Sequence, residues 1–169
     1  MDTGSDSDSD SDPELELDDL DRRILARYQH DTRIPAQEIG DAVGLSAAAV
    51  QRRLKRMRET GVIEAEVARI APAAVGYPVT CIVGVDLDHE RRADIDRFKD
   101  RVQRFPQVQQ CYYVTGQADF ILVVLARDMA DYEAFTREAL LTDPNVKSFT
   151  THVGLDRVKV GSAVPIDGG

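Results

Sequence analysis

The sequence predicts an α+β protein, in which an N-terminal winged helix-turn-helix domain is joined by a hinge strand to a C-terminal ferredoxin-like βαββαβ domain. Apolar residues recur at helical spacing between residues 17 and 60, which indicates a cluster of short amphipathic helices. Apolar residues then alternate strictly from Val79 to Leu87, as in a strand with one buried face. From residue 78 onward, strand-like and helix-like segments follow the split order of a ferredoxin-like sandwich. A chain of 169 residues has room for two such small domains.

The first domain is predicted to contain three helices. Residues 17–29 have the spacing of an amphipathic helix. Pro35 suits the start of a second, short helix, and Gly44 suits its end. Ser46 is expected to cap the third helix by accepting hydrogen bonds from its first-turn amides, and Gly61 to end it. The predicted buried stripe of this third helix consists of Val50, Leu54 and Met57.

The second domain is predicted from segments that alternate between strand and helix patterns. Before it, residues 62–70 are expected to form the hinge strand, and residues 71–78, with two prolines and a glycine, a connector. The strand that follows Gly116 is apolar on both faces, which predicts a central place in the sheet. The expected elements are strands over 79–87, 108–115, 118–126 and 146–155, with helices over 95–105 and after an Asp128 cap.

Composition divides the chain into five segments. The first is a Ser-Asp alternation with seven acidic residues and no base, and it has too little apolar surface to fold, so we expect disorder. The segments are an acidic tail (1–16), the winged helix-turn-helix domain (17–64), the hinge strand and connector (65–77), the ferredoxin-like domain for ligand binding and oligomerisation (78–160) and a C-terminal tail (161–169).

The cysteine content and the apolar runs predict a cytoplasmic protein without a membrane span. The longest apolar run, around residues 120–126, is far shorter than a membrane span, and the N-terminus has no signal-peptide core. Cys81 and Cys111 lie in strand-like segments, where a free cysteine is expected to act as a small buried hydrophobe.

The third helix is a strongly basic segment in an acidic protein. The whole chain has a net charge of -9, but residues 46–60 carry five bases and one acid, a local charge of +4. Such a patch is typical of phosphate contact, which predicts double-stranded DNA as a partner. With the apolar stripe inward, the first two turns face base edges, and residues further along face phosphates. The candidate DNA contacts are Ser46, Ala47, Ala48, Gln51, Arg52, Arg53, Lys55 and Arg56.

Four segments in order resemble the Lrp/AsnC family of feast/famine regulators. They are LDDLDRRILARYQHDTRI, IGDAVGLSAAAVQRRLKRMRETGVI, CYYVTGQADFILVV and VKSFTTHVGLDRVK, and together they extend from about residue 17 to residue 159. The resemblance implies a transcription regulator that forms dimers through its sheets, stacks further into octamers, and binds an amino acid or related metabolite between dimers. It implies no cofactor and no metal.

The glycine-x-x-aspartate turn of the family falls on Gly116 and Asp119. A glycine there lets the backbone approach a ligand, and a lone carboxylate would hold an ammonium group. The alternative is a plain turn in which the aspartate binds backbone amides. Ala118, and Ala48 with Ala49, depart from the family pattern, so the resemblance gives neither the effector nor the operator. The candidate effector contacts are Tyr113, Thr115, Gly116, Gln117, Asp119 and Thr151.

Three other functions are compatible with this organisation. The first domain would bind only protein if its basic helix did not contact DNA. An architectural DNA-binding protein would lack the metabolite switch. Some siroheme decarboxylases share the two-domain plan, but His30, His89 and His152 have no apparent partners for acid-base chemistry, so no catalytic residue is predicted.

Overall fold

The computed structural model describes residues 16–166, which divide into two compact units. The first unit contains residues 16–68 together with residues 161–166, and the second contains residues 69–160. The disorder expected for the acidic tail therefore concerns residues outside the described part, apart from Glu16.

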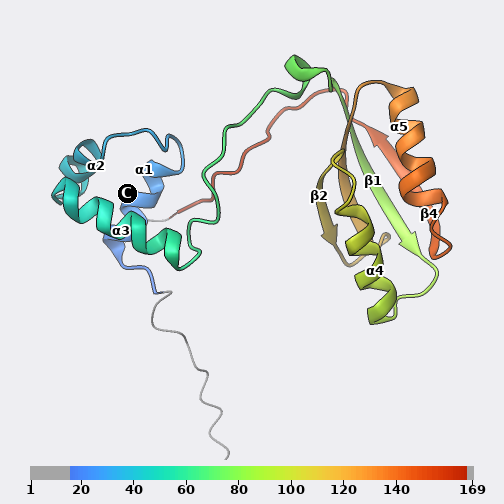
Figure 1. The fold of residues 1–169 in the computed structure, drawn as a ribbon, viewed down its shortest axis with the longest axis horizontal. Coiled ribbons are helices and arrows are strands. Elements are labelled where there is room, and N and C mark those ends of the chain that lie inside the picture. The colour runs from blue at the N-terminus through green and yellow to red at the C-terminus, as the bar shows by residue number, and fades with distance from the viewer. Residues whose placement is uncertain (1–15, 167–169) are drawn as a thin grey trace, which may run out of the picture. The chain divides into compact units, whose positions relative to one another are not determined.

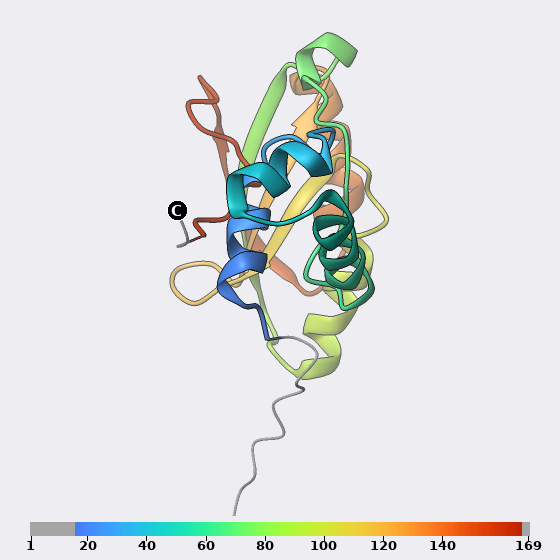
Figure 2. The ribbon, with the colours of Figure 1, turned by 90° about the vertical axis from the view of Figure 1, so that its left-hand side faces the viewer.

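The first unit is built from three helices, α1 (Asp19–Tyr28), α2 (Ala36–Val43) and α3 (Ala47–Glu59) (Figure 1 and Figure 2). Asp18 begins α1 with a reciprocal capping box, in which its carboxylate accepts from the N3 amide and its own amide donates to the N3 carboxylate. Ser46 caps α3, because its hydroxyl accepts from the amide three residues later at 3.2 Å. All three predicted helices are present.

A tight turn joins α2 to α3. Gly44 ends α2 with φ at 77°, a left-handed conformation that glycine adopts without steric cost. Gly40 packs so closely on this turn that a Cβ added to it would overlap the Leu45 carbonyl oxygen. The stripe predicted for α3 is buried, and the core of the unit consists of Ile24, Leu25, Tyr28, Ile39, Val43, Val50, Leu54 and Met57.

The strand predicted over residues 62–70 is not present in the structure. This segment has an irregular backbone and is exposed from residue 64 onward, where Val67 and Ile70 are 81% and 60% exposed. A strand requires a neighbour for its backbone groups, and no described segment pairs with this one. No described residue of the first unit lies in a strand, so its helix-turn-helix has no wing in this structure.

The chain returns to the first unit after the second unit is complete. The side-chain amide of Gln29 donates to the Val164 carbonyl oxygen at 3.0 Å and accepts from the Val164 amide at 2.9 Å. Ile166 packs against the core of the first unit. The segment that the sequence presents as a tail is therefore part of the helix-turn-helix unit.

Replacing Gln29 with alanine is expected to lower the free energy of unfolding of the first unit by about 1 kcal/mol, because two hydrogen bonds are lost at an exposed site. Urea titration of the full chain, followed by helix ellipticity, measures the change. Gln37→Ala is a matched control, since Gln37 bonds only within its own helix, to Asp41. Equal effects of the two substitutions would contradict a role for the returning segment.

The second unit is a four-stranded antiparallel sheet in the order β2-β3-β1-β4, with helices on one face (Figure 1). This is the predicted βαββαβ order, and β3 is central, as its apolar sequence predicts. The elements are η1 (Pro72–Val75), β1 (Val79–Leu87), α4 (Arg92–Val102), β2 (Val108–Tyr113), β3 (Phe120–Ala126), α5 (Met129–Thr136), the π-helical turn η2 (Arg137–Leu141) and β4 (Val146–Val153).

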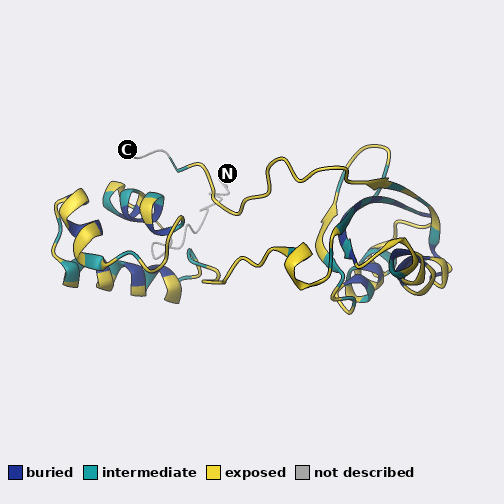
Figure 3. Ribbon diagram, turned by 90° about the horizontal axis from the view of Figure 1, so that it is seen from above, coloured by how far each residue is buried: buried dark blue, intermediate teal, exposed yellow. Residues whose placement is uncertain are grey.

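Strand alternation gives the sheet one buried and one uncovered face. Cys81 and its alternate neighbours pack under α4 and α5, where the buried residues lie in Figure 3. The opposite face presents half-buried apolar side chains, and neither α4 nor α5 covers it, although η1 lies beside Leu125 at one end. These are Ile82, Ile121, Val123 and Leu125. The expectation for Cys111 was wrong: it is exposed, because β2 is an edge strand with little cover.

Candidate functional site

The exposed face of α3 contains most of the candidate DNA contacts. Ser46, Ala48, Gln51, Arg52 and Lys55 are exposed on this face. They lie opposite the buried stripe and within the first three turns of an N-capped helix, where a recognition helix meets DNA. Ala47 is half-buried.

Two of the predicted phosphate contacts bind acidic residues of the protein itself. Arg53 Nη1 lies 2.7 Å from Asp18 Oδ2 and 2.8 Å from Asp21 Oδ1, and Arg56 Nη2 pairs with Asp21 Oδ2. The Asp21 side chain is only 1% exposed. Hydrogen bonds from the Asp21 amide and from Arg53 lower the pKa of Asp18, and the two carboxylates raise the pKa of Arg53.

A second cluster joins the end of α3 to the segment that follows it. Arg58 Nη2 donates to Tyr28 Oη and to Glu66 Oε1, each at 2.8 Å, and Tyr28 donates to the same carboxylate. The three acids in the two clusters offset three bases of α3, and Glu59 offsets a fourth, which leaves a net charge of +1. The basic patch is thus smaller than its sequence indicates.

The Glu66 cluster makes the stability of the first unit sensitive to acid. Hydrogen bonds from Arg58 and then Tyr28 lower the pKa of Glu66 below its ordinary value of 4.5. The folded state therefore favours the ionised carboxylate, and this contribution is complete above pH 4.5 and is lost as the pH falls through the lowered pKa. We expect the thermal midpoint of Glu66→Gln to lie below that of wild type at pH 6, because the variant lacks the ionised carboxylate. Near pH 3 the two midpoints are expected to converge.

The exposed neighbour Glu64 provides the control for this pH series, since none of its side-chain atoms bonds to another described residue. The Glu64→Gln midpoint is expected to follow the wild type at every pH. A Glu66→Gln curve parallel to wild type from pH 6 to pH 3 would show that the cluster does not stabilise the fold.

Four of the six candidate effector residues line one surface hollow of about 710 Å³ at the turn between β2 and β3. They are Tyr113, Thr115, Gly116 and Asp119. Val114, Ala118 and Glu90 complete the lining. Sequence reasoning missed Glu90, because it lies 26 positions before Gly116 in the loop that precedes α4, and only the sheet topology brings that loop to the same edge.

The Asp119 backbone and side chain are both fixed to β1. Its Oδ2 accepts from the Leu87 amide at 2.7 Å, and its own amide donates to the Val85 carbonyl oxygen at 3.0 Å. One carboxylate oxygen therefore has the structural role that the plain-turn alternative describes. Gly116 has φ at 129°, and no atom would meet an added Cβ within 4 Å, so the turn exposes backbone to the hollow.

Two candidate effector residues do not line this hollow. Gln117 is exposed in the turn but is not part of the lining. Thr151 pairs with Val83 in the sheet register, on the helix-covered face, and its hydroxyl bonds to Tyr132 of α5. The structure of one chain thus separates Thr151 from Gly116 and Asp119.

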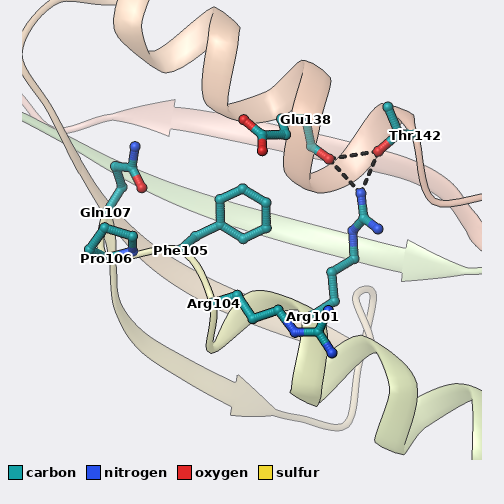
Figure 4. Close-up of a pocket in the computed structure, with 7 residues that line it drawn as sticks. All are labelled: Arg101, Arg104, Phe105, Pro106, Gln107, Glu138 and Thr142. Carbon is teal, nitrogen blue, oxygen red and sulfur yellow. Dashed lines mark hydrogen bonds between the residues drawn. The ribbon is translucent and has the colours of Figure 1, made fainter.

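A different hollow, of about 480 Å³, lies beside the C-terminal end of α4 (Figure 4). Arg101 spans it and donates to the Ala139 carbonyl oxygen at 2.7 Å, and its other bonds reach Glu138 and Thr142. These bonds satisfy carbonyl groups at the end of the π-helical turn. None of the candidate effector residues lines this hollow.

The described residues contain no cluster of His, Cys, Asp and Glu that could hold a metal ion. No helix among them is long and apolar enough to cross a membrane.

Two sequence profiles match the two units. The AsnC-type helix-turn-helix domain matches residues 17–58, and the Lrp/AsnC ligand binding domain matches residues 80–164. The chain belongs to the Lrp/AsnC family. An HTH-type transcriptional regulator of Sinorhizobium fredii is 50% identical to this Lrp/AsnC protein over 152 residues, which cover 90% of each chain.

Solved structures of the Lrp/AsnC family share both units. An AsnC family transcriptional regulator from Agrobacterium tumefaciens superposes with a TM-score of 0.83 at 30% identity, covering 89% of this chain and 98% of that one. A transcriptional regulator of Neisseria meningitidis, in complex with L-Met, gives a TM-score of 0.83 at 25% identity, covering 90% and 98% of the two chains.

Proposed function

We propose that this Lrp/AsnC protein is a DNA-binding transcriptional regulator whose α3 enters the major groove. The observation that carries the proposal is the exposed polar face of the capped α3, in a unit that matches the AsnC-type helix-turn-helix. Gln51 has the chemistry to pair with adenine and Arg52 with guanine. The site of action is chromosomal DNA in the cytoplasm.

The proposed effector is an amino acid or a related small metabolite, bound at the Gly116 hollow. Glu90 and Asp119 are acidic residues in its lining and would attract an ammonium group, while Tyr113 and Ala118 offer apolar surface to a side chain. The relative from Neisseria meningitidis binds L-Met, which supports this ligand class. Gln117 stays a candidate contact at the rim, and Thr151 requires a second copy of the chain or a rearrangement to take part.

The proposed assembly is a homodimer that stacks into octamers or other higher oligomers. The uncovered sheet face supports a second copy as its occupant, because Ile82, Val123 and their apolar neighbours lie half-buried there without a covering element. Such a dimer would present two recognition helices to successive major grooves. Ligand would then act by favouring one stacking of dimers over another.

The first experiment tests DNA binding by anisotropy with full-length protein and a duplex from its own upstream region. Arg52→Ala is expected to weaken binding and to leave the oligomeric state, measured by light scattering, unchanged. Arg69→Ala removes the same charge outside the helix-turn-helix and should bind as wild type. Equal binding by both variants would exclude α3 as the contacting surface.

The second experiment separates a metabolite-responsive regulator from an architectural DNA-binding protein. Thermal stability is screened against the twenty amino acids, since a ligand at 100 times its Kd adds about 2.7 kcal/mol. Gly116→Val is expected to abolish the shift and keep DNA affinity. No shift with any amino acid would favour the architectural function or another effector class. A Gly116→Val variant that lost only DNA binding would show that the hollow is wrongly assigned.

A further inference from the structure

Asp21 is a buried acid of α1 whose side chain contacts α3. The side chain is 1% exposed, and its two oxygens bind different partners: Oδ1 accepts from Arg53 at 2.8 Å, and Oδ2 accepts from Arg56 and from the Asp18 amide. Arg53 and Arg56 are three residues apart, so they project from neighbouring positions on one side of α3. One carboxylate thus contacts α3 at two points.

This contact has a strong energetic preference for a single arrangement. A buried carboxylate without partners is very unfavourable, and removing one partner of a buried ion pair destabilises a protein more than a surface pair would. A rotation of α3 that withdraws Arg53 or Arg56 would leave the buried Asp21 carboxylate with one cationic partner instead of two. The rotation of α3 about its axis decides which residues face outward, so the Asp21 contact restrains that choice together with the buried stripe of α3.

The same contact neutralises the two arginines. Asp18 and Asp21 supply two negative charges for the two guanidinium groups, whose side chains are 26% and 42% exposed. Arg52, in contrast, forms no ion pair within 4 Å with any described residue. Lys55 has only a long, exposed contact with Glu59 at 3.7 Å. The two sets of bases therefore differ in the charge that they can offer to DNA.

We propose that Asp21 is a positioning residue for DNA binding: it holds α3 through Arg53 and Arg56, and leaves phosphate contact to Arg52 and Lys55. This inference rests on the proposed DNA-binding function and assigns different tasks to bases that look equivalent in the sequence. Because each phosphate contact releases counterions, the slope of log Kobs against log salt counts the bases that reach phosphate, at about 0.9 per contact.

The test is a salt titration of the full chain on a labelled 40-base-pair duplex of mixed sequence. Arg52→Gln and Lys55→Gln are each expected to make the slope shallower by about 0.9. Arg53→Gln and Arg56→Gln are expected to keep the wild-type slope and to lower the thermal midpoint. A slope that becomes shallower by about 0.9 with Arg53→Gln or Arg56→Gln would overturn the proposal.

Asp21→Asn is the converse experiment, in which the acid is changed instead of the bases. It keeps the shape of the side chain and removes its charge. One cationic charge is then uncompensated, and the slope is expected to steepen by about 0.9. Asp19→Asn removes an equal charge from the same turn at an exposed position without an ion pair to a described residue, and is expected to change nothing. Asp21→Glu, which restores the charge, should return the slope toward wild type.

The outcomes distinguish this inference from the proposed function. Absence of binding by folded wild-type protein at low salt would refute DNA binding itself. If Arg52→Gln makes the salt slope shallower than that of wild type, but Asp21→Asn and Asp19→Asn give identical slopes, only the role of Asp21 is refuted.

Discussion

Alanine in place of Gly40 is expected to destabilise the first unit by about 1–3 kcal/mol and to abolish DNA binding. The added Cβ would overlap the Leu45 carbonyl oxygen, which belongs to the backbone of the turn and cannot move aside as a flexible side chain would. The Leu45 amide also donates to the Gly40 carbonyl oxygen at 2.9 Å. Relief of the overlap therefore requires α2 and α3 to separate, which changes the presentation of Gln51 and Arg52.

Gly161→Ala is the matched control for Gly40→Ala. It adds the same methyl group to the same unit, at a position where φ is not positive and the added Cβ would meet no atom beyond its chain neighbours within 4 Å. Its unfolding free energy is expected to stay within about 0.5 kcal/mol of wild type. Urea denaturation and duplex binding at fixed salt measure both properties. A Gly40→Ala protein as stable as Gly161→Ala would mean that the turn adapts more easily than the structure implies.

Truncation of Phe120 to alanine is expected to lower the free energy of unfolding of the second unit by about 3–5 kcal/mol. Phe120 is fully buried, and its ring lies 4.7 Å from Phe98 and 5.1 Å from Tyr113, between centroids. Loss of the ring leaves a cavity and removes the support of Tyr113, which lines the Gly116 hollow. The variant should therefore lose any amino-acid response that the wild type shows.

Val158→Ala provides the reference for Phe120→Ala, because Val158 is 88% exposed. Surface truncations of this kind change stability by less than about 0.5 kcal/mol. Chemical denaturation of both proteins, followed by tyrosine fluorescence, gives the difference. A cost below about 1 kcal/mol for Phe120→Ala would contradict the packing of the three rings described above.

Local sequence rules predicted the helix-turn-helix well because its determinants are local. The Ser46 cap, the Gly44 turn and the buried stripe of α3 each depend on residues within a few positions of one another. The partners of Arg53 and Arg56 could not be predicted in this way. Asp21 precedes them by 32 and 35 positions, so the spacing within α3 does not reveal the acid that pairs with both arginines.

The difference between determinants that are close in sequence and partners that are distant in sequence also explains why one predicted strand is absent and why only some effector candidates lie together. Residues 62–70 have strand-forming composition, but a strand depends on a partner that local composition does not reveal. Gly116 and Asp119 were found together because one short turn contains both. Thr151 lies two positions after Phe149 in β4, and residues two positions apart in a strand share a face. Phe149 packs against the helix-side core, so strand alternation places Thr151 on the helix-covered face as well.

The docking of Val164 and Ile166 makes the helix-turn-helix a module encoded in two pieces. A gene fragment that stops at residue 68 would omit the partner of Gln29 and one side chain that packs on the core. Domain-swap chimaeras within the family therefore require two junctions, one on each side of residues 69–160, to exchange sensor modules intact. A fluorophore attached at residue 165 would report on the DNA-binding module, although it is separated from α3 by more than a hundred residues of sequence.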